Sequence, residues 1–110
     1  MKIAALQEYR NRFFDRKELY FLDWAVSEEI RAACWKNLAD TLDRLISLGP
    51  HGTVDAATEL LRGCVETFNE LDTGFICTIE REELCIILYE IGGLCGLDDK
   101  EDWVDPWRDW

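Results

Sequence analysis

Residues 53–71, which read TVDAATELLRGCVETFNEL, decide the fold class of this chain. Apolar side chains recur through them at steps of three and four, the spacing that places side chains on one face of a helix. These residues are Val54, Ala57, Leu61, Cys64, Phe68 and Leu71. Thr53 is a good N-cap residue at the start, and Asp72-Thr73-Gly74 ends the pattern. The stretch therefore predicts an amphipathic helix with one buried face.

Two more helices are predicted on the N-terminal side of this stretch. Residues 3–13 carry a stripe of apolar side chains at helical spacing and predict a first helix. Residues 19–26 are aromatic and apolar, which fits either a continued helix or a buried connector. Ser27, followed by two glutamates, predicts the start of a second helix that Gly49-Pro50 ends. Its inward side chains are expected to be Ile30, Cys34, Leu38, Leu42 and Leu45.

A fourth helix is predicted after the break, with Thr78 as its N-cap. Its apolar face is formed by Leu84, Ile87, Leu88, Ile91 and either Leu94 or Cys95. Gly92-Gly93 inside this pattern costs about 1 kcal/mol per residue relative to alanine, so the pair marks either close packing or an early helix end. Gly96 is the predicted stop, with Leu97 packing back as in a Schellman-type cap.

The remaining residues, 98–110, are acidic and carry three tryptophans. Asp105 before Pro106 predicts the N-cap of a short helical turn. A chain of 110 residues without an internal repeat or linker fits one domain. We therefore predict a single helical domain over residues 1–110, an all-α compact bundle of four to five helices with an acidic Trp-containing C-terminal tail.

The acidic charge is concentrated in the later part of the chain. There are 23 acidic and 12 basic residues, a net charge of -11. Up to Val65 ten acidic residues stand against nine basic ones, and from Glu66 onward thirteen stand against three. Such a field repels phosphate backbones and anionic lipids, so we expect no nucleic-acid or membrane partner and favour a basic protein. The plainer interpretation is a solvated face with a frayed tail.

The start of the chain turns polar too soon for a secretory signal, and no run of about 18 apolar residues is present. The five cysteines are odd in number and form no C-x-x-C pair, which argues against a disulfide framework or a thiolate zinc site. Most of them fall on or beside the apolar stripes. We therefore expect a protein of the reducing cytoplasm.

Catalytic patterns are weak in this sequence. His51 is the only histidine and lies in a Gly-Pro-His-Gly turn, no glycine-rich phosphate loop is present, and carboxylates are too abundant to be specific. We therefore predict that the protein is not an enzyme and needs no cofactor. Cys77, in the connector before the fourth helix, is the one thiol worth testing, and it defines an alternative hypothesis of a thiol-based enzyme or sensor.

Residues 69–80 have the length of an EF-hand loop, with Gly74 and Glu80 at its sixth and twelfth places. Leu71 occupies the third place, where Ca²⁺ needs an oxygen ligand, so we predict no metal site and a plain helix-loop-helix turn.

The candidate partner-binding residues combine carboxylates with tail tryptophans, because aromatic area supplies affinity and charge selects the partner. They are Glu66, Glu70, Asp72, Glu80, Glu83, Asp98, Asp99, Asp102, Trp103, Asp105 and Trp107. An alternative for the tryptophans is that the tail folds back and its indoles cover the open end of the bundle.

Residues 74–84, GFICTIEREEL, precede a helix ending near Gly96 and a terminal Trp-Arg-Asp-Trp. Over residues 73–110 this pattern resembles small acidic bacterial immunity proteins of polymorphic toxin systems, of the Rhs-type or contact-dependent kind. Gly92-Gly93 departs from it. The resemblance implies a cytoplasmic protein that binds a cognate toxin domain and blocks its active site. A nuclease toxin would fit, because its phosphate-binding cleft must be basic. The main alternative is an acidic adaptor or nucleic-acid mimic that binds a basic host protein.

Overall fold

The computed structural model describes residues 2–15, 21, 24–97 and 102–110. Four helices form within these ranges, α1 (Ile3–Asp15), α2 (Glu28–Ser47), α3 (Val54–Leu71) and α4 (Thr78–Leu94), and the described residues include no strand. The predicted all-α bundle is confirmed. The predicted partner-binding residues Asp98 and Asp99 lie outside the described residues.

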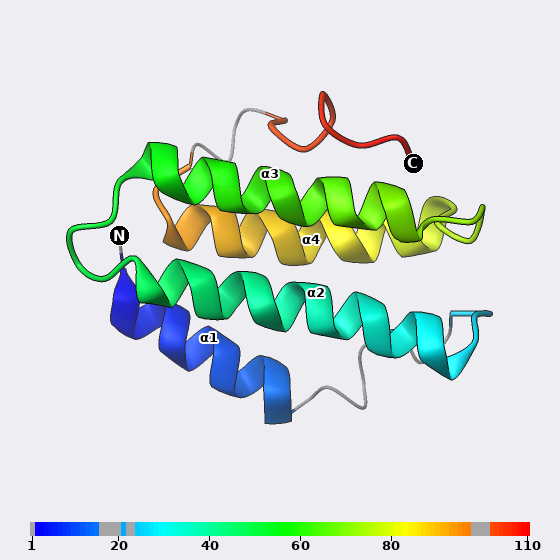
Figure 1. Cartoon of the computed structure of the whole chain (residues 1–110), viewed down its shortest axis with the longest axis horizontal. Helices are drawn as coiled ribbons and strands as arrows, with labels where there is room; N and C mark the ends of the chain where they lie inside the picture. Colours follow the sequence, from blue (N-terminus) through cyan, green and yellow to red (C-terminus); the bar gives the residue numbers. More distant parts are fainter. Residues whose placement is uncertain (1, 16–20, 22–23, 98–101) are drawn as a thin grey trace.

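The four helices run alternately up and down the bundle (Figure 1). Helix α2 packs on both α1 and α3, and α4 packs on α1 and α3. The backbone N–H of Lys2 donates to the carbonyl of Leu94 at 3.3 Å, which joins the start of α1 to the end of α4. The last residues then return across α3 (Figure 1). Over the described ranges, none of the helices combines the length and apolar character needed to cross a bilayer.

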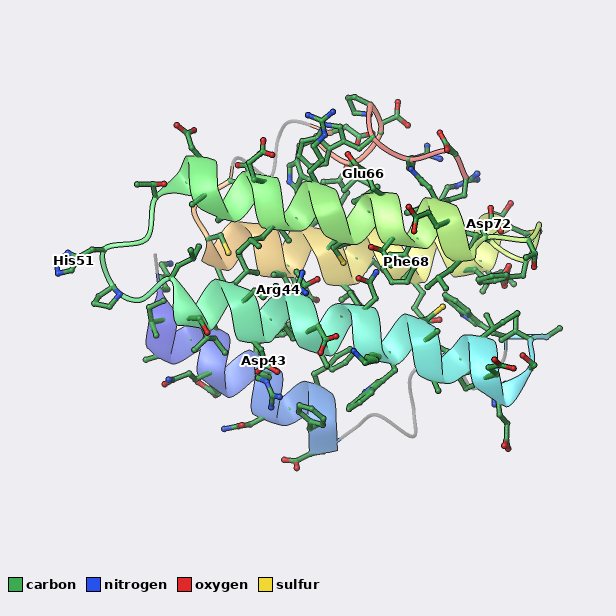
Figure 2. All side chains as sticks on the ribbon, viewed as in Figure 1. Asp43, Arg44, His51, Glu66, Phe68 and Asp72 are labelled. Carbon is green, nitrogen blue, oxygen red and sulfur yellow. The ribbon has the colours of Figure 1, made fainter. Side chains whose placement is uncertain are left out.

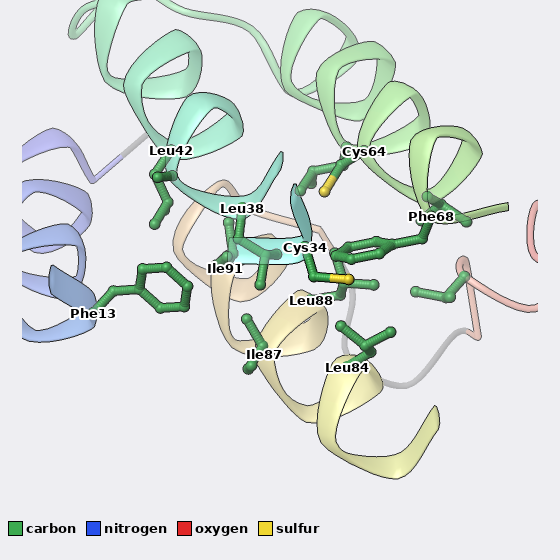
Figure 3. Close-up of a cluster of buried hydrophobic side chains, with 14 of the residues drawn as sticks. Phe13, Cys34, Leu38, Leu42, Cys64, Phe68, Leu84, Ile87, Leu88 and Ile91 are labelled. Carbon is green, nitrogen blue, oxygen red and sulfur yellow. The ribbon is translucent and has the colours of Figure 1, made fainter. Parts of the chain in front are cut away.

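The core forms where the apolar stripes of all four helices meet (Figure 3). The inward positions predicted for the middle turns of α2, α3 and α4 are buried. Val54, expected on the buried face, is 45% exposed because it is the first residue of α3, at the end of the bundle. Ile30 and Leu71, which also lie near helix ends, are half-buried.

Two of the predicted helix starts are confirmed by side-chain caps. Ser27 accepts a backbone N–H bond at 3.2 Å, and Thr53 accepts one at 3.1 Å. Helix α4 begins one residue earlier than predicted, because Cys77 is the N-cap rather than Thr78. The carboxylate of Glu80 accepts the N–H of Cys77 at 3.0 Å, which satisfies a donor at this helix end without a capping hydroxyl.

Helix α4 continues through both glycines to Leu94. Gly96 has a φ of 92°, and Leu97 and Gly96 donate to the carbonyls of Gly92 and Gly93 at 3.0 and 3.2 Å. These two bonds are the Schellman pattern, so the predicted helix end is confirmed. Gly92-Gly93 is therefore not an early helix end.

The connector before α2 is non-helical where the structure describes it, at Phe21 and residues 24–26, and two of its aromatic side chains are buried. Phe21 and Trp24 are buried, with ring centroids 4.4 Å apart. Arg31 of α2 donates to the carbonyls of both residues at 3.0 Å. Of the two alternatives for this stretch, the buried connector is what the described residues adopt.

Candidate protein-binding surface

The acidic charge lies on one side of the bundle. Among the described residues up to Thr53, which include α1 and α2, six acidic side chains are balanced by six basic ones. From Val54 onward, the described residues include twelve acidic and three basic side chains. Helices α3 and α4 lie next to each other, and the C-terminal segment runs along α3 (Figure 1). We call α3, α4 and residues 102–110 the acidic side.

The tail, residues 102–110, is folded onto this side. Asn69 of α3 donates to the carbonyl of Trp107 at 2.8 Å and accepts from the N–H of Asp109 at 2.9 Å. Val104 is fully buried, and Trp110 is buried with its ring 6.5 Å from that of Phe68. The tail is therefore part of the packed structure.

The helical turn in the tail begins one residue before the predicted N-cap. The carbonyl of Val104 accepts the N–H of Trp107 at 3.0 Å and that of Arg108 at 3.1 Å. Asp102 accepts the N–H of Asp105 at 3.0 Å. The prediction of Asp105 as N-cap is wrong, because burial of Val104 and the carboxylate of Asp102 place the turn earlier.

The two predicted anchor tryptophans are half-buried: Trp103 packs against α4, whereas Trp107 packs against Trp103 and lies near Arg62 of α3. The ring of Trp103 meets that of Tyr89 edge-on at 5.3 Å and that of Trp107 at 5.5 Å. A Cβ placed on Gly92 would lie 2.6 Å from a ring carbon of Trp103, so this glycine admits the indole. Close packing therefore explains Gly92, and the tail does fold back on the bundle. The role of the tryptophans in partner binding stays a prediction.

Three of the predicted partner-binding carboxylates hold the fold together. Asp72 accepts two backbone N–H bonds, at 2.9 and 3.1 Å, from the loop that follows α3. Glu80 caps α4, as described above. Glu83 accepts the indole N–H of Trp24 at 3.0 Å and the backbone N–H of Phe21 at 3.3 Å. These acids shape the surface through the loops that they fix.

Asp102 and Asp105 also have partners within the chain. Asp102 accepts the hydroxyl proton of Tyr89, and Asp105 forms an ion pair with Arg108. The bond from Tyr89 lowers the pKa of Asp102 below its ordinary value. Burial, and then the bond to Asp102, raises the pKa of Tyr89. Asp102 therefore joins the tail to α4 in its ionised form.

Several exposed carboxylates lie on α3 and α4. Glu66 and Glu70 are exposed on α3, and Figure 2 shows Glu66 on the side of the helix nearest the tail. Glu66 pairs with Arg62 at 2.9 Å, and because both side chains are about half exposed the pair adds little stability. Glu82, which the sequence analysis did not single out, is exposed on α4.

Two exposed isoleucines accompany these acids and were also missed. Ile79 is 69% exposed and Ile86 is 60% exposed, both on α4. The signal available in the sequence was that both are apolar yet fall outside the buried stripe of this helix. Exposed apolar groups bordered by polar side chains are typical of a protein-binding surface.

The thiols and the histidine form no dyad at the connector. Cys77 is exposed at the start of α4, whereas His51 lies in the α2–α3 loop, at the opposite end of the bundle from Asp72 (Figure 2). Burial raises the pKa of Cys34 and Cys95 to about 11 and that of Cys64 to about 12, so these thiols stay protonated at neutral pH. The described part of the chain gathers no group of three metal-binding side chains.

A groove of about 500 Å³ between α2 and α3 is the alternative surface. Its walls carry Lys36 and Arg44 as well as Asp40 and Glu59, so it has no dominant charge. The acidic side is therefore the surface with a distinct chemical character. No protein-family model matches this chain, and no curated protein or solved structure is significantly similar to it.

Proposed function

We propose that this protein binds and neutralises a cognate bacterial toxin domain, with its acidic side covering the toxin's active site. The observation that carries the proposal is the division of charge among the described residues: twelve acidic side chains stand against three basic ones from Val54 onward, and the two kinds are equal in number before it. Carboxylates gathered on one side repel one another, which destabilises the free protein. The same negative potential speeds and orients association with a basic partner. The pattern over residues 73–110 that resembles immunity proteins supports the same role.

A nuclease domain is the toxin class that fits this chemistry best. Its substrate-binding cleft must be positively charged to hold phosphates, and an acidic surface that enters the cleft competes with the substrate. The protein would act by binding alone, in the cytoplasm where the toxin acts. Glu66, Glu70 and Glu82 are among the exposed carboxylates that would supply the field.

The deciding experiment expresses the product of an adjacent toxic reading frame with and without this chain and scores survival. We expect growth arrest with the toxin alone and rescue by the chain. The absence of an adjacent toxic product, together with binding to a basic host protein, would favour the acidic adaptor.

Charge reversal then tests the surface. The variant E66K/E70K/E82K should slow association with the toxin by about tenfold or more and flatten its salt dependence between about 50 and 500 mM. The matched control E8K/E28K/E29K makes the same change in net charge at exposed positions of α1 and α2. Equal loss of rescue in both variants, with folding verified by circular dichroism, would contradict the assignment to the acidic side.

A further inference from the structure

The outer face of α4 carries a line of residues that stay exposed in the folded chain. We define the α4 ridge as Ile79, Glu82, Ile86, Glu90 and Gly93, all of which are exposed. Among the described residues only one other large apolar side chain is exposed, Val54 at 45%, and it lies on α3. The two most exposed large apolar side chains therefore share one ridge.

The apolar and glycine positions of the ridge repeat every seven residues. Ile79, Ile86 and Gly93 follow one another at that interval, so successive members lie about 10 Å apart along the helix axis. A seven-residue repeat is the row that one helix presents to a second helix packed along it. The spacing therefore points to a helical occupant rather than to a compact small molecule.

Gly93 is the second part of the ridge that intramolecular packing leaves unexplained. A Cβ at this position would meet nothing within 4 Å, whereas a Cβ at Gly92 would collide with Trp103. A glycine inside a helix is less favourable than alanine. It does allow the backbone of a neighbour to approach closely, which a partner helix at this end of the ridge would use.

The charge of the ridge selects the occupant. Glu82 lies between the two isoleucines, and Glu90 accepts the hydroxyl proton of Tyr9 at 2.8 Å while staying exposed. The ridge carries no basic side chain. A second copy of this chain would place glutamates against glutamates on a molecule of net charge -11, so self-pairing is disfavoured.

We propose that the α4 ridge docks a basic amphipathic helix of a partner protein. Ile79 and Ile86 are its apolar anchors, Glu82 and Glu90 face lysine or arginine side chains of the partner, and Gly93 admits close approach. This inference deepens the proposed function and rests on it for the identity of the partner as a toxin domain. The anchors would then be aliphatic side chains of α4 rather than the tail tryptophans.

The test uses a synthetic helix of lysine and leucine at heptad spacing as the probe. A second peptide of the same charge, with serine in place of leucine, reports on electrostatic attraction alone. Amide shifts in NMR spectra of the full chain should map the lysine–leucine peptide to the α4 ridge. The serine peptide should bind at least about tenfold more weakly, as expected if apolar anchors carry the affinity.

Variants of the chain make the assignment specific. I79S/I86S should weaken binding of the lysine–leucine peptide by about tenfold or more. The control V54S removes an exposed aliphatic group elsewhere and should leave the affinity within about twofold. All three side chains are exposed, so the variants are expected to fold.

Several outcomes would overturn the proposal. These are shifts confined to the tail or to the α2–α3 groove, equal affinity for both peptides, or a dimer in ultracentrifugation that I79S/I86S disrupts. Rescue from the toxin by I79S/I86S at the level of the parent chain would reject the ridge and leave the proposed function standing. Peptide binding at the ridge without any rescue by the parent chain would support the ridge and reject the toxin partner.

Discussion

Each of two faces of α4 carries a glycine, and the surroundings of the two glycines differ. On one face the tail lies against the helix, and Gly92 makes room for the indole of Trp103. On the other face Gly93 has open space around it and shares a ridge with Ile79 and Ile86. The two glycines therefore need separate explanations: packing against Trp103 accounts for Gly92, and the partner helix proposed above would account for Gly93.

The face of α4 that contacts Trp103 also shows what holds the tail on the bundle. Tyr89, Gly92 and Trp103 form a contact that is completed by the carboxylate of Asp102. Trp103, which the sequence offered as a partner anchor, is thus half-buried against α4. The open ridge keeps its apolar groups exposed, which makes it the better place to look for an anchor.

The largest expected effect on stability comes from adding a side chain at Gly92, on the face of α4 that the tail covers. Gly92→Ala places a methyl group 2.6 Å from a ring carbon of Trp103, so the indole and the tail must move. We expect a loss of about 1–3 kcal/mol in the free energy of unfolding, as for overpacked cores. Urea unfolding measures the loss, and a red shift of tryptophan fluorescence reports the displaced indole.

The matched control is Gly63→Ala, an exposed glycine of α3 at which a Cβ would meet nothing within 4 Å. It should be neutral or stabilising. If Gly92→Ala kept the stability and fluorescence of the parent chain, the tail would not depend on this contact, and the two faces would no longer differ.

The opposite change in the free energy of unfolding is expected for a substitution at the next residue, Gly93. Gly93→Ala adds helix propensity without a clash and should stabilise the protein by about 0.5–1 kcal/mol. The same change should weaken binding of the lysine–leucine peptide several-fold if a helix approaches the ridge closely. Tighter peptide binding by Gly93→Ala would show that close approach at this position plays no part.

The smallest expected effect is the response of the tail to acid. Because the folded pKa of Asp102 is lowered, its contribution to stability is fully present above the unfolded value of about 3.9 and is lost as the pH falls through the folded pKa. Tryptophan fluorescence followed from pH 7 to strongly acidic solution should show the tail loosening below about pH 4.

Asp102→Asn should remove that acid-dependent step, whereas Asp109→Asn should retain it. Asp109 is the comparison because it lies in the same tail and its backbone N–H, rather than its carboxylate, makes the bond to Asn69. An acid transition of equal size in parent and Asp102→Asn chains would assign the loosening to other carboxylates.

Most of the fold could be predicted because its signals are local. The spacing of apolar residues in α2, α3 and α4 and the caps at Ser27 and Thr53 need only a few turns of chain to be read. The errors at Thr78 and Asp105 are shifts of one residue. At both places a carboxylate from a nearby position accepts a backbone N–H. The helix or turn therefore begins one residue before the capping residue that the sequence suggested.

The acidic surface could be predicted in sum but not in detail. The total charge and its concentration after Glu66 follow from counting residues. Which carboxylates remain open does not, because Glu83 is engaged by Trp24, 59 residues away, and Asp102 by Tyr89 of α4. Partners so distant along the chain leave no periodic trace in the sequence.

The amino-acid sequence alone thus determined the helices, their buried faces and the excess of negative charge, since each depends on residue type and near-neighbour spacing. Tertiary structure decided which of the acids hold loops in place, that the tail lies on α3 and α4, and that two isoleucines of α4 remain uncovered. The physical reason is that burial of a side chain depends on which segments meet in space, and adjacent glycines with the same local chemistry can face a tryptophan or open solvent.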